Sequence, residues 1–390
     1  MRMKTTTSIV FTGDIGFDHY MAGKWQDKNL LDPEVLAFLK SGDHLCVNVE
    51  GALSAGEKKL KDNSVASLMH SMDPAVGDFL EEIGADIWNI CNNHIMDAGP
   101  DGLKDTLEVA GRHNARTLGA GMNIAEAMAP VIIPDAGGIA IFGVGYQRAC
   151  RKADENTPGC FSWSDMDAIK SSIALAKETN RYVVIVAHGG EEFTSLPSPY
   201  TRDRYLAYLD MGADVVVAHH PHVPMNYETV GDKLIIYSLG NFIFDTDYQR
   251  SQFNTEKGIL VRLTFGGERV SLDSFGLEID RESERIVKAE LPRIYADVQP
   301  GEYELLKGLA ARAFVENTKR QQRYLKPGKY DNATEVDWHE NFYEPMRSGR
   351  VPGECLDFQI ICPLAETYEN RNWEKSSLTD VRDYILEQIP

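Results

Sequence analysis

A short apolar strand that ends in histidines limits what this chain can fold into. Residues 215–217 are Val-Val-Val, and His219, His220 and His222 follow closely. A run of β-branched residues is typical of a buried strand. In an extended chain His220 and His222 would point the same way, so they could bind one metal ion or two adjacent ions. Surface or capping histidines are the alternative. The metal hypothesis therefore requires carboxylate or amide ligands from elsewhere in the chain.

Apolar strands alternate with helices along the rest of the chain. The main strands are predicted at residues 8–12, 44–49, 86–91, 139–144 and 182–187. The helices are predicted at residues 33–40, 73–83, 101–113, 165–179 and 202–211. This order predicts an α/β fold with a layered sheet. Two later features are a hairpin at residues 225–229 and 233–237, and strands at residues 259–265 and 270–277 that would complete a second sheet.

Several of these strands end in residues that can bind a metal ion. The strand ends carry Asp14, Glu50, Asn93, His188, His220 and His222. Because α/β sheets place ligands at the carboxyl ends of their strands, we expect these side chains to meet. Mixed nitrogen and oxygen ligands suit Mn, Fe or Zn better than Mg or Ca, and one carboxylate could bridge two ions. Two such ions are the usual arrangement for hydrolysing phosphate esters. His94, next to Asn93, is placed to protonate a leaving group.

Further polar residues near these strand ends are candidates for contacting a substrate. They are His19, Asn48, Glu192, His219 and Asn241. Asn241 lies in a loop after the predicted hairpin, and an ordinary turn explains this loop equally well. These residues therefore extend the predicted site without defining its chemistry.

The composition bears on partners and compartment. A net charge of −19 argues against binding to the phosphate backbone of a nucleic acid. The N-terminus lacks the apolar core of a signal peptide, and no stretch reaches membrane-spanning length, so we expect a cytoplasmic protein. The six cysteines show no Cys-x-x-Cys spacing, so they indicate neither a disulfide framework nor a thiolate zinc site. The oligomeric state has no signal in the sequence.

The character of the chain changes near residue 290. Beyond it we predict helices at residues 303–315 and 378–388, a basic run at residues 319–323, and an irregular aromatic-rich segment. We therefore expect one α/β domain over residues 1–290 and a helical, irregular C-terminal extension over residues 291–390 that packs on it. The basic run is either a solvated helix end or a contact for an anionic substrate. The aromatic residues either cap a core or form a module that binds carbohydrate or peptide.

Ordered motifs over residues 8–265 resemble those of calcineurin-like metallophosphoesterases, and more closely the CapA/PgsA group named for capsule and poly-γ-glutamate synthesis. The motifs are Gly13-Asp14, Asn48-x-Glu50, Asn92-Asn93-His94-Ile-Met-Asp97, Gly119-Ala-Gly121, His188-Gly-Gly-Glu-Glu192, His219-His220-Pro-His222 and Tyr237-Ser-Leu-Gly-Asn241-Phe242. The resemblance implies a four-layer α/β/β/α sandwich. It also implies that the strand-end residues listed above are metal ligands, with Glu50 as the bridge and His94 as the general acid.

The sequence departs from this pattern at Gly16, where the phosphoesterase Asp-x-His motif has its histidine. One of the two ions would then lack a ligand and bind weakly, unless Asp18, His19 or water supplies the missing ligand. Glu50 stands where phosphoesterases commonly use aspartate, a feature that the CapA-like group shares. Group members in capsule synthesis are typically anchored outside the membrane, and this chain shows no anchor.

Two hypotheses follow from these patterns. The first is a dimetal hydrolase that acts on a phosphoester, or on a γ-glutamyl or other amide bond, in a small molecule or an anionic polymer. The second is a non-catalytic component of a machine that assembles poly-γ-glutamate or another capsule polymer. The predicted ligand set and His94 favour the enzyme, whereas the missing histidine at Gly16 favours the component.

Overall fold

The computed structural model describes residues 3–55, 69–145 and 151–298, apart from residues 191, 194, 195, 198, 251 and 253. The predicted helices at residues 303–315 and 378–388, the basic run, and nearly all of the C-terminal extension lie outside these residues. The division into a domain over residues 1–290 and an extension over residues 291–390 therefore stays a prediction.

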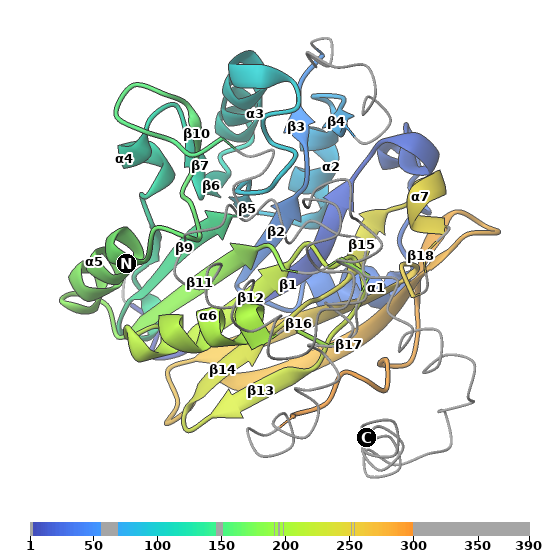
Figure 1. The fold of residues 1–390 in the computed structure, drawn as a ribbon. Coiled ribbons are helices and arrows are strands. Elements are labelled where there is room, and N and C mark those ends of the chain that lie inside the picture. The colour runs from blue at the N-terminus through green and yellow to red at the C-terminus, as the bar shows by residue number, and fades with distance from the viewer. Residues whose placement is uncertain are drawn as a thin grey trace, which may run out of the picture.

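The first sheet is a mixed sheet of eight strands built around β1 (Thr7–Gly16) (Figure 1). Its order is β18 (Arg285–Lys288), β17 (Ser271–Asp280), β16 (Lys257–Phe265), β1, β2 (His44–Val49), β5 (Ile87–Asn89) and β6 (Arg116–Leu118). β15 (Asn241–Phe244) runs parallel to the end of β1 and places Asn241 opposite Asp14. β16 pairs antiparallel with the start of β1. The expectation that β16 and β17 complete a second sheet is therefore wrong, because they extend the first.

The second sheet has six strands. Its order is β13 (Tyr227–Val230), β14 (Lys233–Ile236), β12 (Val215–His219), β11 (Tyr182–His188), β9 (Ile139–Gly145) and β8 (Val131–Ile133). The four central strands are parallel, and β13 and β14 form the predicted hairpin. Two short pairs lie outside the main sheets, β3 (Ala52–Leu53) with β4 (Ser71–Met72) and β7 (Ala120–Gly121) with β10 (Gly159–Cys160).

Helices pack on the outer face of each sheet. α1 (Pro33–Leu39), α2 (Val76–Ile83) and α3 (Gly99–Arg112) share an apolar cluster with the first sheet. α5 (Met166–Lys177) and α6 (Pro199–Asp210) share another with the second sheet. The remaining described helices are α4 (Ile124–Ala127), α7 (Asp247–Arg250) and the 3-10 turns His19–Met21, Lys24–Gln26 and Asp135–Gly137. The predicted α/β fold class is confirmed.

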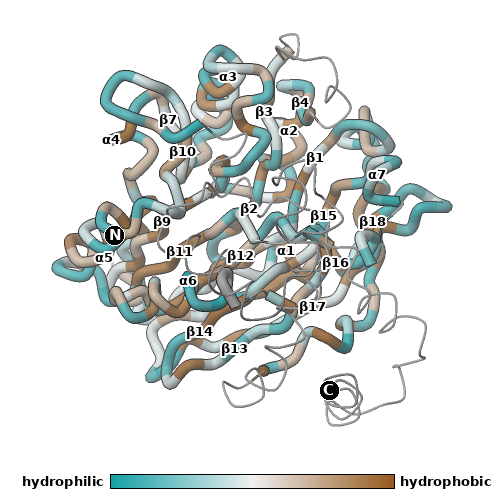
Figure 2. The backbone as a smooth tube through the Cα atoms, viewed as in Figure 1, coloured by the Kyte–Doolittle hydropathy of each residue, from teal (hydrophilic) through white to brown (hydrophobic). Residues whose placement is uncertain are grey.

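A third apolar cluster joins the inner faces of the two sheets. Phe11 of β1 meets residues of β11 and β12 there, and Val215 and Val217 belong to the same cluster. Val216 belongs instead to the outer cluster with the helices, because successive side chains of a strand point to opposite faces. Figure 2 shows hydrophobic residues concentrated along these central strands. Both faces of the three central strands β9, β11 and β12 are therefore buried, and their polar side chains lie at the strand ends.

Two further observations concern membranes and cysteines. In the part of the chain that the structure describes, every helix is too short or too polar to cross a membrane. Cys160 is disulfide-bonded, a bond that the cysteine spacing did not indicate. Cys46 and Cys91 are buried free thiols. Burial raises the pKa values of both thiols well above the usual range, so they act as apolar core residues.

Candidate metal centre

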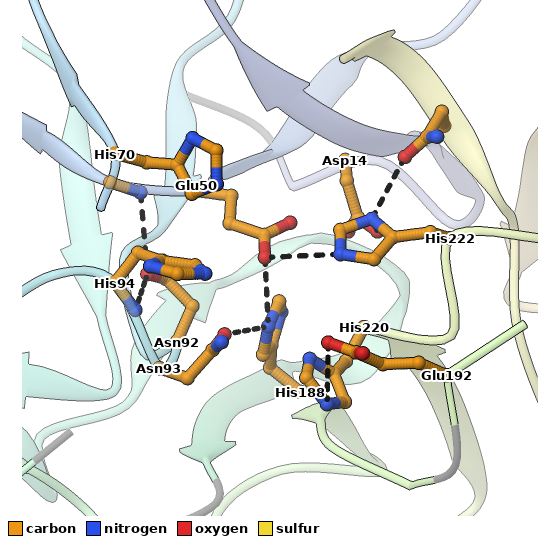
Figure 3. Close-up of polar contacts among 12 residues, drawn as sticks. Asp14, Glu50, His70, Asn92, Asn93, His94, His188, Glu192, His220 and His222 are labelled. Atoms are coloured by element: carbon orange, nitrogen blue, oxygen red, sulfur yellow. Dashed lines mark hydrogen bonds and ion pairs between the residues drawn. The ribbon is translucent and has the colours of Figure 1, made fainter. Parts of the chain in front are cut away.

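The two sheets bring the predicted ligands together at one edge (Figure 3). Asp14 lies in β1, Glu50 directly follows β2, and Asn93 lies in the loop after β5. His188 is the last residue of β11, and His220 and His222 follow β12. All six side chains belong to residues that are at least nine-tenths buried. The first sheet thus contributes the oxygen ligands and the second sheet the imidazoles.

Glu50 lies between two histidines. Its Oε1 atom is 3.5 Å from His188 Nε2 and 3.6 Å from His222 Nε2, and Figure 3 shows these contacts as dashed lines. The Oδ2 atom of Asp14 is 3.3 Å from His222 Nδ1. Two clusters of possible metal ligands result, one of Glu50, His220 and His222 and one of Asp14, Glu50 and His188. Glu50 is the member that the two clusters share.

The carboxylate oxygens at this centre have few polar partners in the protein. Both oxygens of Glu50 and Oδ2 of Asp14 are buried and accept no hydrogen bond from the described residues. Burying a carboxylate without hydrogen bonds raises the free energy of the folded state by about several kcal/mol. A bound cation or another positive charge would offset this cost. Carboxylate oxygens together with imidazole nitrogens fit divalent transition metals. The residues present therefore fit a metal centre.

Burial and neighbouring charges shift the pKa values of these residues in different directions. Burial raises the pKa of Glu50 to about 7, although the charge on His222 opposes this shift. Burial also acts to lower the pKa of His222, but the charges of Glu50 and Asp14 outweigh it and raise that pKa to about 10. The pKa of His188 falls well below its usual value because of burial and neighbouring histidines. A cation would be attracted to the Asp14 and Glu50 side of the centre.

The local backbone explains how these side chains reach the centre. β1 continues past Asp14 to Gly16, so this carboxylate lies within a strand and not in a turn beyond it. A Cβ atom on Gly13 would lie 2.2 Å from the carbonyl oxygen of Gly240, so only glycine allows this approach. His220 and His222 have φ angles of 96° and 58°. The expectation that both lie in an extended chain is therefore wrong, and their strained backbone is of a kind found at functional sites.

Two of the predicted substrate contacts, Asn48 and Asn241, lie within hydrogen-bonding distance of predicted metal ligands. The Nδ2 atom of Asn48 donates to Asp14 Oδ1 at 2.8 Å and is 3.2 Å from His188 Nδ1. Asn241 Oδ1 lies 3.0 Å from His222 Nδ1. Both asparagines are fully buried. Such contacts fix the orientation of ligands.

The other predicted substrate contacts are dispersed. His219 Nε2 donates to the carbonyl oxygen of Thr12 at 2.8 Å, so this imidazole links the two sheets. Glu192 is partly buried, with Oε1 3.9 Å from His220 Nε2. His19 is exposed and lies near Asp18 and His70. Asn93 Oδ1, a predicted ligand atom, lies 2.8 Å from His188 Nε2.

The place of the missing histidine at Gly16 is filled by an aromatic ring. A Cβ atom on Gly16 would lie 2.6 Å from the ring of Phe244. This ring stacks on His222 with the centroids 4.8 Å apart. Asp18 and His19 group with His70 and not with Asp14. The side of the centre near Gly16 is therefore apolar.

His94 is held beside the centre by a carboxylate. Its Nδ1 atom lies 2.7 Å from Asp97 Oδ2. Burial acts to lower the pKa of His94, but the charge and hydrogen bond of Asp97 and the charge of Glu50 outweigh it and raise that pKa to about 9. No role for Asp97 follows from the strand-end pattern, although its place three residues after His94 is a signal that could have identified it.

His70 is a second imidazole that the sequence reasoning missed. It is buried, its ring centroid is 4.3 Å from that of His94, and its Nδ1 atom is 2.6 Å from Asp18 Oδ2. His70 follows no predicted strand, so the strand-end pattern that identified the other residues could not have found it.

The comparisons with known proteins bear on this centre. A protein-family model described as "Bacterial capsule synthesis protein PGA_cap" matches residues 8–246, more than half of the chain. The chain belongs to this family. The matched range of the PGA_cap family contains every predicted metal ligand as well as His70 and His94, and the predicted family is confirmed.

Curated relatives of this PGA_cap chain carry related descriptions. It is 30% identical over 250 residues to "PGA biosynthesis protein CapA" of Bacillus subtilis, covering 63% of this chain and 65% of the relative. It is 29% identical over 225 residues to "Capsule biosynthesis protein CapA" of Bacillus anthracis, covering 56% and 54%. The chain thus matches less than two thirds of the length of either relative.

Solved structures show more distant similarity. A putative 5'-nucleotidase from Staphylococcus aureus aligns with a TM-score of 0.43 and 14% identity, covering 73% of this PGA_cap chain and 55% of that one. A purple acid phosphatase from yellow lupin aligns with a TM-score of 0.30 and 11% identity, covering 75% and 54%.

Proposed function

We propose that this chain is a metal-dependent hydrolase that cleaves phosphate esters at a dinuclear centre. The observation that carries the proposal is Glu50, a buried carboxylate whose oxygens accept no hydrogen bond from the described residues. It belongs to two overlapping groups of possible ligands. A carboxylate in this position suits a bridge between two cations.

The residues that would hold the ions are those predicted from the strand ends. They are Asp14, Glu50, Asn93, His188, His220 and His222. Their mixture of oxygen and nitrogen atoms favours Mn, Fe or Zn. When bound, two such ions supply Lewis acidity to water and to the ester oxygens. Asn48 and Asn241 would keep Asp14, His188 and His222 in position through the hydrogen bonds described above.

His94 would transfer the proton to the leaving group. Asp97 holds Nδ1 of this imidazole, so Nε2 is the atom available to a substrate. The Asp97 carboxylate also favours the protonated imidazole, which is the form that a general acid requires. Burial of the surrounding residues limits the access of bulk water, which strengthens each of these electrostatic interactions.

The alternative function is a component of poly-γ-glutamate or capsule polymer synthesis that is non-catalytic or acts on an amide or γ-glutamyl bond. Two observations favour it. The relatives from Bacillus subtilis and Bacillus anthracis are described as biosynthesis proteins for PGA and capsule. In addition, Phe244 fills the place of a metal ligand that phosphoesterases use. The substrate or partner would then be an anionic polymer.

A hydrolysis assay distinguishes these functions. The purified protein is loaded separately with Mn, Fe and Zn and given 4-nitrophenyl phosphate or γ-glutamyl-4-nitroanilide. Chelator-treated protein is the control. The proposal predicts release of nitrophenol that requires metal. Release of nitroaniline alone would assign the amide-bond activity, and no release from either compound would favour the non-catalytic component.

A further inference from the structure

His70 lies at the edge of the centre without being one of the ligands predicted there. Its Cβ atom would be 3.1 Å from a Cβ added at Gly51, the residue after Glu50, so the two backbones are in close contact. Its ring packs against Phe244 at 4.8 Å between centroids, and Phe244 stacks at the same distance on His222. One aromatic ring therefore connects His70 with the metal centre.

His70 and His94 are held in the same way. Each presents Nδ1 to a carboxylate, at 2.6 Å from Asp18 and 2.7 Å from Asp97. Asp97 also accepts a hydrogen bond from the backbone N–H of His70 at 2.9 Å, so it positions both residues. The two rings are nearly perpendicular, with an interplanar angle of 89°. The structure thus holds two imidazoles side by side, and in the described part of the chain the hydrogen bonds of both rings are made through Nδ1.

The distance between Asp18 and His70 is shorter than the distance between two ligands of one metal ion. Ligand atoms about 2.1 Å from one ion are separated from one another by roughly 3 Å or more. The carboxylate–histidine pairs of Glu50 and Asp14 with His188 and His222 span 3.3–3.6 Å. The Asp18–His70 pair, at 2.6 Å, has the length of a charge-assisted hydrogen bond. His19 Nε2 lies 3.9 Å from Asp18, and its side chain is one third exposed. A third metal site at Asp18, His19 and His70 is therefore disfavoured.

The hydrogen bond to Asp18 also sets the tautomer of His70. A carboxylate only accepts hydrogen bonds, so the proton lies on Nδ1 of His70. Nε2 of the neutral imidazole then carries a lone pair and accepts a hydrogen bond. In the proposed reaction His94 is a proton donor to the leaving-group oxygen, whereas His70 Nε2 is a hydrogen-bond acceptor.

We infer that His70 binds the leaving group of the substrate and that this leaving group carries a hydroxyl near the scissile oxygen. Asp18 acts as a positioning residue for His70. The inference rests on the proposed function, since it places the leaving group beside His94. His94 would protonate the scissile oxygen, while His70 Nε2 would accept a hydrogen bond from the neighbouring hydroxyl.

Binding of two phosphonates to the Mn-loaded protein tests this inference. 3,4-Dihydroxybutylphosphonate carries two hydroxyls, butylphosphonate carries none, and neither contains an ester bond to cleave. We expect wild-type protein to bind the dihydroxy compound about tenfold more tightly in calorimetry, the effect of one good hydrogen bond. His70→Asn keeps an amide N–H for Asp18 but has no acceptor at the Nε2 position, so the preference should disappear. His70→Gln, whose amide reaches that position, should restore part of it.

His113→Asn is the matched control. His113 is also paired with a carboxylate, 2.8 Å from Glu81, but it lies at the C-terminal end of α3 and pairs with α2. This variant should keep the wild-type preference. Elemental analysis of His70→Asn should find the wild-type metal content.

Several outcomes would overturn the inference. They are equal affinity of wild-type protein for the two phosphonates, no binding of either one, an unchanged preference in His70→Asn, or loss of metal from that variant. Hydrolysis of glycerol 1-phosphate is measured in parallel. The expected binding preference without hydrolysis would contradict the proposed function and leave the leaving-group subsite standing. Hydrolysis without a binding preference would support the proposed function and contradict the leaving-group subsite.

Discussion

Two glutamates of this molecule are equally buried and are treated in opposite ways. Glu228 in β13 is fully buried and accepts hydrogen bonds from Arg202 Nε at 2.9 Å, a second Arg202 nitrogen at 2.6 Å and the Tyr237 hydroxyl at 2.8 Å. Glu50 is fully buried too, yet neither of its oxygens accepts a hydrogen bond from the described residues.

The two sites differ in what compensates the buried charge. At Glu228 the protein supplies its own counter-ion in a bidentate pair. At Glu50 it surrounds the carboxylate with imidazoles at 3.5 and 3.6 Å instead of a guanidinium, and an imidazole that releases its proton can bind a metal ion. In the first arrangement the protein itself compensates the buried charge. In the second arrangement a bound cation would compensate the charge of Glu50.

The largest effect is expected from His94→Ala. If the imidazoles around Glu50 hold metal and His94 acts on the substrate, this variant keeps its metal content and loses about 10²–10⁴-fold in kcat. Elemental analysis and turnover of an alkyl phosphate, whose leaving group needs a proton, are measured on the same sample. Loss of metal together with activity would make His94 part of the metal-holding group.

Arg202→Met should turn Glu228 into a buried carboxylate without a counter-ion. We expect the free energy of unfolding to fall by about 3–5 kcal/mol, because one partner of a buried ion pair is left uncompensated. Urea unfolding measures this change. The double variant Arg202→Met/Glu228→Leu should recover much of the loss. A decrease below about 1 kcal/mol in the single variant would show that the Arg202–Glu228 pair does not neutralise this site.

Glu50→Gln should increase the free energy of unfolding of chelator-treated protein, whereas Arg202→Met decreases it. Removing a buried charge that accepts no hydrogen bond should stabilise the metal-free fold by about 1–3 kcal/mol. It should also reduce the rise in Tm that we expect added Mn to cause in wild-type protein. Thermal unfolding with and without Mn measures both effects. Destabilisation of the metal-free variant would mean that the protein itself neutralises Glu50.

Asn48→Ala tests the residues behind the ligands. Loss of its hydrogen bonds to Asp14 and His188 should weaken metal binding by about 10–100-fold. Competition with a chromogenic chelator measures the affinity. Asn123→Ala is the control, because Asn123 caps α4 away from the predicted ligands and should leave metal affinity unchanged. Equal affinities of wild-type protein and Asn48→Ala would contradict the supporting role.

Much of the fold could be predicted because its strands have strong local signals. The β-branched run of β12 is buried on both faces, as its composition indicated. The pairing of β16 with β1 could not be predicted, because it joins residues far apart in the sequence and no local pattern specifies the partner. The Cys160 disulfide was missed for a similar reason, since the cysteine spacing carried no signal for it.

The grouping of the candidate metal ligands could be predicted where a residue's place on a strand decides its neighbours. Asp14, Glu50 and His188 follow that rule. Asn48 and His219 also lie at strand ends, but the strand register turns Asn48 beneath the ligands and His219 toward Thr12. His70 reaches the centre only through tertiary packing against Phe244 and Asp18, so sequence position alone did not reveal it.

Elemental analysis of wild-type protein, Glu50→Gln and Glu228→Gln, after loading with Mn and removal of excess metal, tests whether Glu50 is shared by two ions. If Glu50 is shared by two ions, wild-type protein and Glu228→Gln each retain about two ions per chain, and Glu50→Gln retains at most about one. Wild-type protein without bound metal, or Glu50→Gln with the wild-type content, would contradict the account.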